Sequence, residues 1–201
     1  MANEKYSTRQ TLLMRAQDPE DNNAWEEFIK FYRPFICKIL RRMKISLNDF
    51  DDLVQDVLVK LWKGLPKYDS QKAKFRTWLS RVTRNTVISF IRTKSSRLDL
   101  AKMESYEADE ISFINSFSES ALEKIFEEEW RTYICSLALQ KIETLFTGKA
   151  VAAFKLSQKG KSPAEIALEM GLSKDSVPVL TSRVRSKFTA ELKSLVTNLE
   201  F

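Results

Sequence analysis

The sequence predicts an all-α fold. Glycine and proline are scarce among its 201 residues, at 4 and 5, whereas Leu, Lys, Glu and Arg, which favour helices, are abundant. Hydrophobic residues make up 43% of the chain, which is ample for a core. Apolar side chains recur three and four residues apart along several segments. We therefore expect a set of amphipathic helices.

The first half of the chain contains three such segments after a short helix expected around Thr11 to Ala16. A long helix is expected from Ala24 to Met43, and another from Asp51 to Leu65. The apolar stripe of the second helix is expected to consist of Leu53, Val54, Val57, Leu58, Leu61 and Trp62. The polar break between them offers Asn48 or Asp49 as the cap of the second helix.

The third segment, Phe75 to Arg92, combines an apolar face with a basic face. The apolar side holds Phe75, Leu79, Val82, Thr86 and Phe90, with Trp78 at its margin. Between Ser70 and Arg97 there are eight Lys or Arg residues and no Asp or Glu, so the opposite side suits a polyanion. An ordinary solvated helix face remains the alternative. We interpret Trp78 as a core residue, because large aromatic side chains dominate core burial.

An acidic stretch follows this helix. Between Glu104 and Glu129 there are nine acidic residues and one basic residue. We expect the region around Thr93 to Ser118 to be a flexible linker, because its composition is polar and charged. Helical patterning returns at Leu122.

The last part of the chain carries the pattern of a helix-turn-helix. Ser162 precedes Pro163 and Glu165, as in a capped helix start. Gly171 ends that helix by permitting a left-handed backbone, and Ser173 is expected to cap a longer helix running to about Leu195.

Pro178 leaves the start of the longer helix open. The helix begins late, capped by Ser176, with Val177 and Pro178 in its first turn, or it begins at Lys174 and bends.

Several chemistries are excluded or unsupported. The chain has no His, which rules out a Ser or Cys nucleophile with a His base, and its two cysteines, Cys37 and Cys135, cannot build a familiar zinc site. A Gly-rich phosphate loop is also missing. We expect no catalytic residue, no metal and no cofactor. Without a secretory segment or a membrane-length apolar run, a cytoplasmic protein that does not insert into membranes is expected, and the net charge of +6 favours an anionic partner.

Three motifs, in this order, resemble the sigma-70 family of bacterial transcription initiation factors, and in particular its ECF (extracytoplasmic function) type. Residues 52–57, Asp-Leu-Val-Gln-Asp-Val, resemble the core-polymerase-binding helix of region 2.2. Residues 74–79, with Arg84 and Asn85, resemble the part of region 2 that melts and reads the −10 element. Residues 165–167, 171–173 and 182–185 resemble region 4.2, which reads the −35 element.

The resemblance implies two small helical domains joined by a flexible acidic linker. Residues 1–97 would form the region 2 helical bundle, residues 98–121 the linker, and residues 122–201 the region 4 helix-turn-helix. The linker's acidic residues would either mimic nucleic acid inside the polymerase or form a simple tether.

The resemblance also implies three sets of binding residues. Core polymerase would contact Asp52, Gln55, Asp56, Val59 and Lys60. The −10 element would contact Lys72, Lys74, Arg76, Arg81, Arg84, Asn85 and Arg92. The −35 element would contact Lys174, Ser176, Val179, Leu180, Ser182, Arg183, Arg185 and Lys187. The implied partners are core RNA polymerase, through its β′ clamp helices and β flap, promoter DNA, and an anti-sigma factor.

Two other classes of function are weighed against a sigma factor. A stand-alone helix-turn-helix regulator would bind duplex DNA without polymerase, but it would have no need of exposed Asp52, Gln55 and Asp56. Dipole stabilisation at a helix start is the simpler explanation for those carboxylates. An enzyme acting on nucleic acid is disfavoured, because the chain lacks His and a clustered set of metal ligands.

Overall fold

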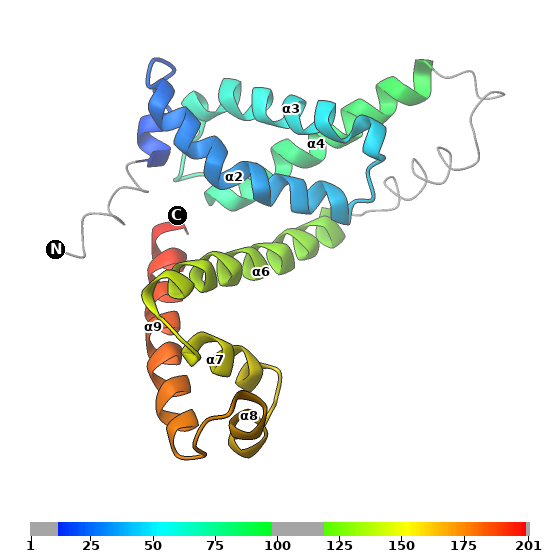
Figure 1. Ribbon diagram of the computed structural model, residues 1–201. Coiled ribbons are helices and arrows are strands. Elements are labelled where there is room, and N and C mark those ends of the chain that lie inside the picture. Colours follow the sequence, from blue (N-terminus) through cyan, green and yellow to red (C-terminus); the bar gives the residue numbers. More distant parts are fainter. Residues whose placement is uncertain (1–11, 98–118, 200–201) are drawn as a thin grey trace. The chain divides into compact units, whose positions relative to one another are not determined.

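A computed structural model describes residues 12–97 and 119–199, and these residues form helices and connecting turns (Figure 1). The predicted all-α fold class is confirmed. The chain divides into two compact units, the first reaching to Arg131 and the second covering Thr132–Thr197. Within the described ranges, no helix is both long and apolar enough to cross a membrane.

The first unit is a bundle of long helices. A helical segment at residues 12–16 leads to α2 (Asn22–Arg42) and α3 (Leu47–Gly64). A 3-10 turn, η1 (Leu65–Lys67), then leads to α4 (Phe75–Arg97). Helix α3 packs against both α2 and α4 (Figure 1).

The core of this unit is rich in aromatic and aliphatic side chains from all three helices. Phe28, Tyr32 and Phe35 of α2 are almost fully buried, as are Leu53 of α3 and Phe75 of α4. The ring of Phe75 lies edge-on to that of Phe28, with centroids 5.9 Å apart. Burial of such side chains is the main favourable term in folding, at roughly 1.5–3 kcal/mol each.

Helix α3 begins earlier than the sequence suggested. Ser46 is its cap, and the hydroxyl of Ser46 accepts a hydrogen bond from the N–H of Asn48 at 3.3 Å. The prediction that Asn48 or Asp49 would cap this helix is therefore wrong. Both residues lie in its first turn instead, where the carboxylate of Asp49 favours the helix dipole.

The buried face of α4 is rotated relative to the predicted one. Thr83, Val87 and Ile91 are buried, whereas Val82 and Phe90 are only half-buried. Hydroxyl groups such as that of Thr83 are tolerated there because they donate to carbonyls one turn back, in this case to that of Leu79 at 2.9 Å.

An aromatic cluster closes the loop between η1 and α4. Trp78 is half-buried, and its ring lies 5.2 Å from that of Tyr68 and 5.5 Å from that of Phe75. A Cβ at Gly64 would come within 3.0 Å of the Trp78 ring, so this close approach requires glycine. These contacts support the interpretation of Trp78 as a packing residue.

The second unit contains the end of α6 (Glu119–Leu145), α7 (Ala150–Gln158), α8 (Pro163–Met170) and α9 (Ser176–Leu199). One core cluster joins α6, α7 and α9 through Ile142, Val151, Phe154 and Val184. A second joins α7, α8 and α9 through Ala153, Ile166, Ala167 and Val177.

Both ends of α8 have the predicted chemistry. Ser162 and Glu165 form a reciprocal capping box, and Gly171 has a left-handed backbone with φ of 59°. Helix α9 begins at Ser176, whose N–H donates to the hydroxyl of Ser173 at 3.2 Å. Pro178 therefore lies in the first turn of α9, as in the later of the two predicted starts, but Ser176 is the first residue of the helix and not its cap.

The expected linker can be compared with the structure only in part. Residues 98–118 lie outside the described residues, and α6 already begins at Glu119. The two compact units divide within α6, after Arg131. The domain limits at residues 97 and 122 stay predictions.

Candidate functional site

The five residues expected to contact core polymerase share the outer side of α3. Asp52, Gln55, Asp56, Val59 and Lys60 are all exposed. They recur at intervals of three and four residues, so they form one continuous strip, called here the α3 face. An acidic and amide region at its start is followed by an apolar and a basic side chain.

A groove runs beside the α3 face toward α4. Its volume is about 530 Å³, and it is lined by Asp49, Asp52, Asp56 and Lys60 from α3 and by Thr86, Ser89, Phe90, Thr93 and Lys94 from α4. Lys94 Nζ lies 2.8 Å from Asp49 Oδ2 and ties the two helices together. The groove therefore presents carboxylates beside cationic side chains.

Trp62 also belongs to the α3 face, and the sequence did not indicate this. The apolar stripe of α3 was expected to include Trp62, but 44% of its surface is exposed. That expectation is wrong, because the side of α3 packed on α2 and α4 is filled by Leu53, Val57 and Leu61. The spacing from Gln55 to Trp62, two helical turns, is the signal that would have placed it on the outer side.

On α4, the structure brings together three of the residues expected to contact the −10 element. Arg81, Asn85 and Arg92 are exposed and follow one another at helical spacing, so they lie on the same side, called here the α4 face. Arg84 lies at its edge and is half-buried, and its Nε atom is enclosed without a hydrogen-bond acceptor among the described residues.

Arg76 does not belong to the α4 face. Its side chain is only 18% exposed, with Nη2 3.2 Å from Glu127 Oε2. The guanidinium also lies over the ring of Trp130, at 5.6 Å from the centroid. Both partners come from the first half of α6, which the sequence reading had assigned to the other domain.

Lys72 and Lys74 lie on an ordered loop before α4. Both are exposed, and Lys72 Nζ is 3.7 Å from Asp69 Oδ2. The Tyr68 hydroxyl donates to the carbonyl of Ala73 at 2.9 Å and so closes the loop. Burial in the aromatic cluster raises the pKa of Tyr68, which therefore remains a donor.

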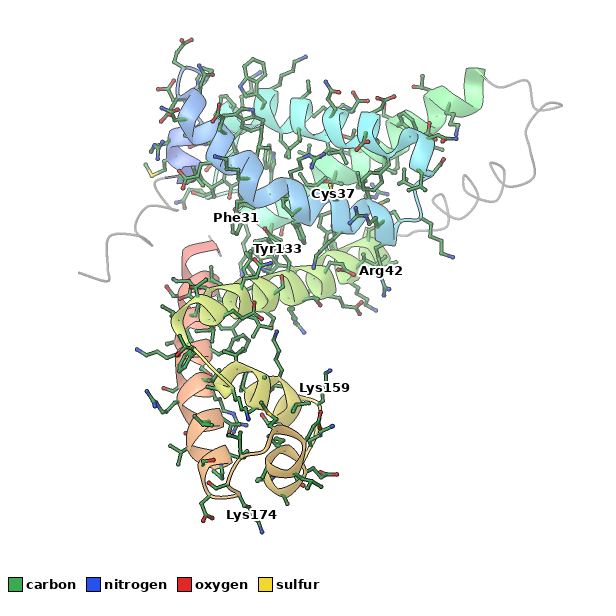
Figure 2. The ribbon with its side chains drawn as sticks, viewed as in Figure 1. Phe31, Cys37, Arg42, Tyr133, Lys159 and Lys174 are labelled. Carbon is green, nitrogen blue, oxygen red and sulfur yellow. The ribbon has the colours of Figure 1, made fainter. Side chains whose placement is uncertain are left out.

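The residues expected to read the −35 element divide between two environments. Most are exposed on the turn before α9 and along α9: Lys174, Val179, Ser182, Arg183, Arg185 and Lys187. Figure 2 shows Lys174 at the tip of this turn. Ser176 is half-buried, and Leu180 packs against the core cluster that contains Val184.

Helical spacing separates the two arginines of α9. Val179 and Ser182 lie on the side opposite the buried Val184, whereas Arg183 and Arg185, one residue before and one after Val184, lie on the two flanks. The groove beside Arg183 and Lys187 has a volume of about 450 Å³ and is also lined by Leu145, Phe146, Thr147, Ala150 and Leu180. The fold and these surfaces define an all-helical protein with a helix-turn-helix unit and a basic helix.

Comparison with known proteins narrows this class. Residues 28–97 match the family model for sigma-70 region 2. The RNA polymerase sigma factor NccH of Alcaligenes xylosoxydans xylosoxydans is 26% identical over 186 residues, covering 90% of this chain and 94% of the relative. The RNA polymerase sigma factor SigZ of Bacillus subtilis is 26% identical over 165 residues, covering 82% of each chain. The ECF RNA polymerase sigma-E factor of Haemophilus influenzae is 29% identical over 90 residues, covering 45% of this chain and 46% of the relative.

Residues 28–97 thus carry the sequence pattern of sigma-70 region 2, and the chain over most of its length is similar to RNA polymerase sigma factors, with relatives of the ECF type among its shorter matches. A solved structure of CnrH in complex with the cytosolic domain of CnrY is 21% identical, with a TM-score of 0.35 over 92% of this chain and 96% of that chain.

Proposed function

We propose that the protein is a sigma factor of the ECF type, which directs promoter-specific transcription initiation as a non-catalytic subunit of RNA polymerase. The observation that carries the proposal is the presence, in one unit, of the acidic and amide α3 face and the basic α4 face. A protein that only binds DNA has use for the second surface and not for the first. A polymerase subunit needs both.

The α3 face is the proposed contact with core polymerase. Asp52 and Asp56 suit a basic helical surface, such as the β′ clamp helices would provide, and Gln55 between them adds hydrogen-bonding capacity. The neighbouring exposed Val59 and Trp62 supply apolar contact area, and aromatic side chains are enriched among residues that dominate interface energetics.

The α4 face and the loop before it are the proposed contacts with the −10 element. Arg81 and Arg92 supply charge for phosphates, and the Asn85 amide can pair with a base edge. Lys72 and Lys74 extend the positive surface along the loop. Holding an opened strand requires such phosphate contacts.

The second unit is the proposed reader of the −35 element. The start of α9 would enter the major groove, with Val179, Ser182 and Arg183 toward the bases. Arg185 and Lys174 would contact phosphates. The β flap and an anti-sigma factor are further proposed partners of the protein.

Binding to core RNA polymerase tests the proposal directly. Gln55→Ala with Asp56→Ala should weaken assembly of the holoenzyme without changing the fold, because both side chains are exposed. Asn23→Ala with Glu26→Ala on α2 is the matched control, since it also removes one exposed amide and one exposed carboxylate. Assembly and transcription equal to the parent in the α3 variant would contradict the proposal. A parent that binds promoter DNA but not polymerase would instead indicate a stand-alone regulator.

A further inference from the structure

The first half of α6 is docked on the first unit by aromatic packing. Leu122, Phe126 and Trp130, four residues apart, are each buried, at 3–4% exposed. The Phe35 ring of α2 lies 5.9 Å from the ring of Phe126 and 5.1 Å from that of Trp130, both nearly edge-on. Residues 122–131 thus form an amphipathic segment, called here the α6 latch, whose apolar side rests on α2.

The polar side of the α6 latch is strongly acidic and meets basic side chains. Arg42, at the end of α2, lies 3.8 Å from Glu128 and 3.8 Å from Glu129 (Figure 2 shows Arg42). Arg76 of α4 lies 3.2 Å from Glu127. The latch therefore offers two α-helices of this unit an array of carboxylates, much as a nucleic acid offers phosphates.

The ion pair between Arg76 and the α6 latch is much less exposed to solvent than the pair between Arg42 and Glu128. Arg42 and Glu128 are both more than half exposed, at 56% and 67%, so this pair contributes little to stability. Glu129 is only 22% exposed, so its charge is less screened and it is the Arg42 partner more sensitive to a reversal of charge at Arg42. Arg76 is 18% exposed and is held by a carboxylate on one side and by the Trp130 ring on the other. A guanidinium held in this way has little of its surface left for a phosphate.

We propose that the α6 latch is an intramolecular competitor of nucleic acid, which holds Arg76 until promoter DNA or polymerase displaces it. The inference rests on the proposed function, because it treats Arg76 as a DNA contact. A latch of this kind lowers the affinity of the free protein for DNA. The competing explanation is that residues 122–131 simply complete the core of the first unit.

A first test measures binding of a fluorescent single-stranded oligonucleotide to the full chain by anisotropy at low salt. Glu127→Gln should bind several-fold more tightly than the parent. Glu143→Gln is the matched control, because it removes the same charge from the same helix, where Glu143 pairs with Lys155. An equal gain in both variants would overturn the inference, since it would reflect total charge alone.

A second variant separates the latch from general electrostatics, because the two predict changes in DNA affinity of opposite sign. Arg42→Glu removes a positive charge, so general electrostatics predicts weaker binding of DNA. The latch predicts tighter binding, because the new carboxylate repels Glu128 and Glu129 and loosens α6. Adding Glu128→Arg and Glu129→Arg should return the affinity toward that of the parent. Weaker or unchanged binding by Arg42→Glu would overturn the inference.

Hydrogen–deuterium exchange separates failure of the latch from failure of the proposed function. Arg42→Glu should speed exchange at residues 122–131, whereas Glu143→Gln should not. A parent that binds DNA, together with unchanged exchange in Arg42→Glu, would overturn the latch and leave the proposed function standing. Faster exchange with no DNA binding by any variant would overturn both, because the segment would open without uncovering a DNA contact.

Discussion

Removing the two outer arginines of the α4 face should change the salt dependence of promoter binding by a predictable amount. Arg81 and Arg92 are both exposed on the same side of α4. At ~1.5 Å of rise per residue they are about 16 Å apart along the helix axis, too far apart to share one phosphate. Each substitution with alanine should therefore remove its own phosphate contact.

The expected magnitude follows from counterion release. Each lost contact should reduce the slope of log affinity against log salt by roughly 0.7 for a single strand and 0.9 for a duplex. Raising the salt from about 50 to about 200 mM lowers the affinity of the parent for DNA by some factor. That factor should be about threefold smaller in each single variant and about tenfold smaller in the double variant. Arg84→Ala should change the slope less, because Arg84 is half-buried.

The assay is equilibrium binding of the holoenzyme to promoter DNA at several salt concentrations. Lys30→Ala with Arg33→Ala is the control, since it removes two exposed cations from α2 in the same unit. An unchanged slope in the Arg81→Ala and Arg92→Ala double variant would refute the reasoning. So would an equal fall in the control, because the effect would then come from net charge.

Three further substitutions test other parts of the structure. Gly64→Ala should lower the free energy of unfolding in urea by about 1 kcal/mol, because overpacking against Trp78 costs about 1–3 kcal/mol and the alanine gains up to about 1 in helix propensity; a stabilised variant would contradict this. Ser162→Ala should lower the thermal unfolding midpoint at neutral pH, because Ser162 donates to Glu165 and so lowers the pKa of that carboxyl below its usual 4.5. This stabilisation is present above the unfolded-state pKa and is lost as the pH falls through the folded-state pKa, so the difference between the midpoints of parent and variant should narrow in acid to the contribution of the bond from the Glu165 N–H to the Ser162 hydroxyl; a difference that does not change with pH would argue against the Ser162–Glu165 carboxylate bond. Arg183→Ala should lose roughly 1–3 kcal/mol of binding only at promoters with a guanine in its reach, as a promoter-library selection would show, and a uniform loss would indicate a phosphate contact instead.

The sequence predicted best the features that depend on a few neighbouring residues. The capping box of Ser162 and Glu165 and the left-handed Gly171 were confirmed, because their hydrogen bonds and backbone angles are set within one turn. The amphipathic pattern likewise predicted the helices themselves. Caps, turns and helices of this kind can be predicted because they depend on residues that are close together in the sequence.

Features that depend on distant segments were not predictable in the same way. Trp62 looks like a core residue at helical spacing, but which side of α3 is covered depends on α2 and α4. Arg76 was read as an exposed cation, yet it is enclosed by Glu127 and Trp130 from far along the chain. Periodicity gives the faces of one helix and says little about which partner covers them.

The placement of Pro178 has a consequence for the entropy of DNA recognition. Because α9 begins at Ser176, Pro178 lies in the first turn, where backbone N–H groups have no partner within the helix. Its missing N–H therefore costs no hydrogen bond, while its ring fixes φ near −65°. A fixed torsion beside the exposed Val179 leaves less backbone freedom to be lost when this end of the helix meets a ligand, so the helix start is organised in advance of binding.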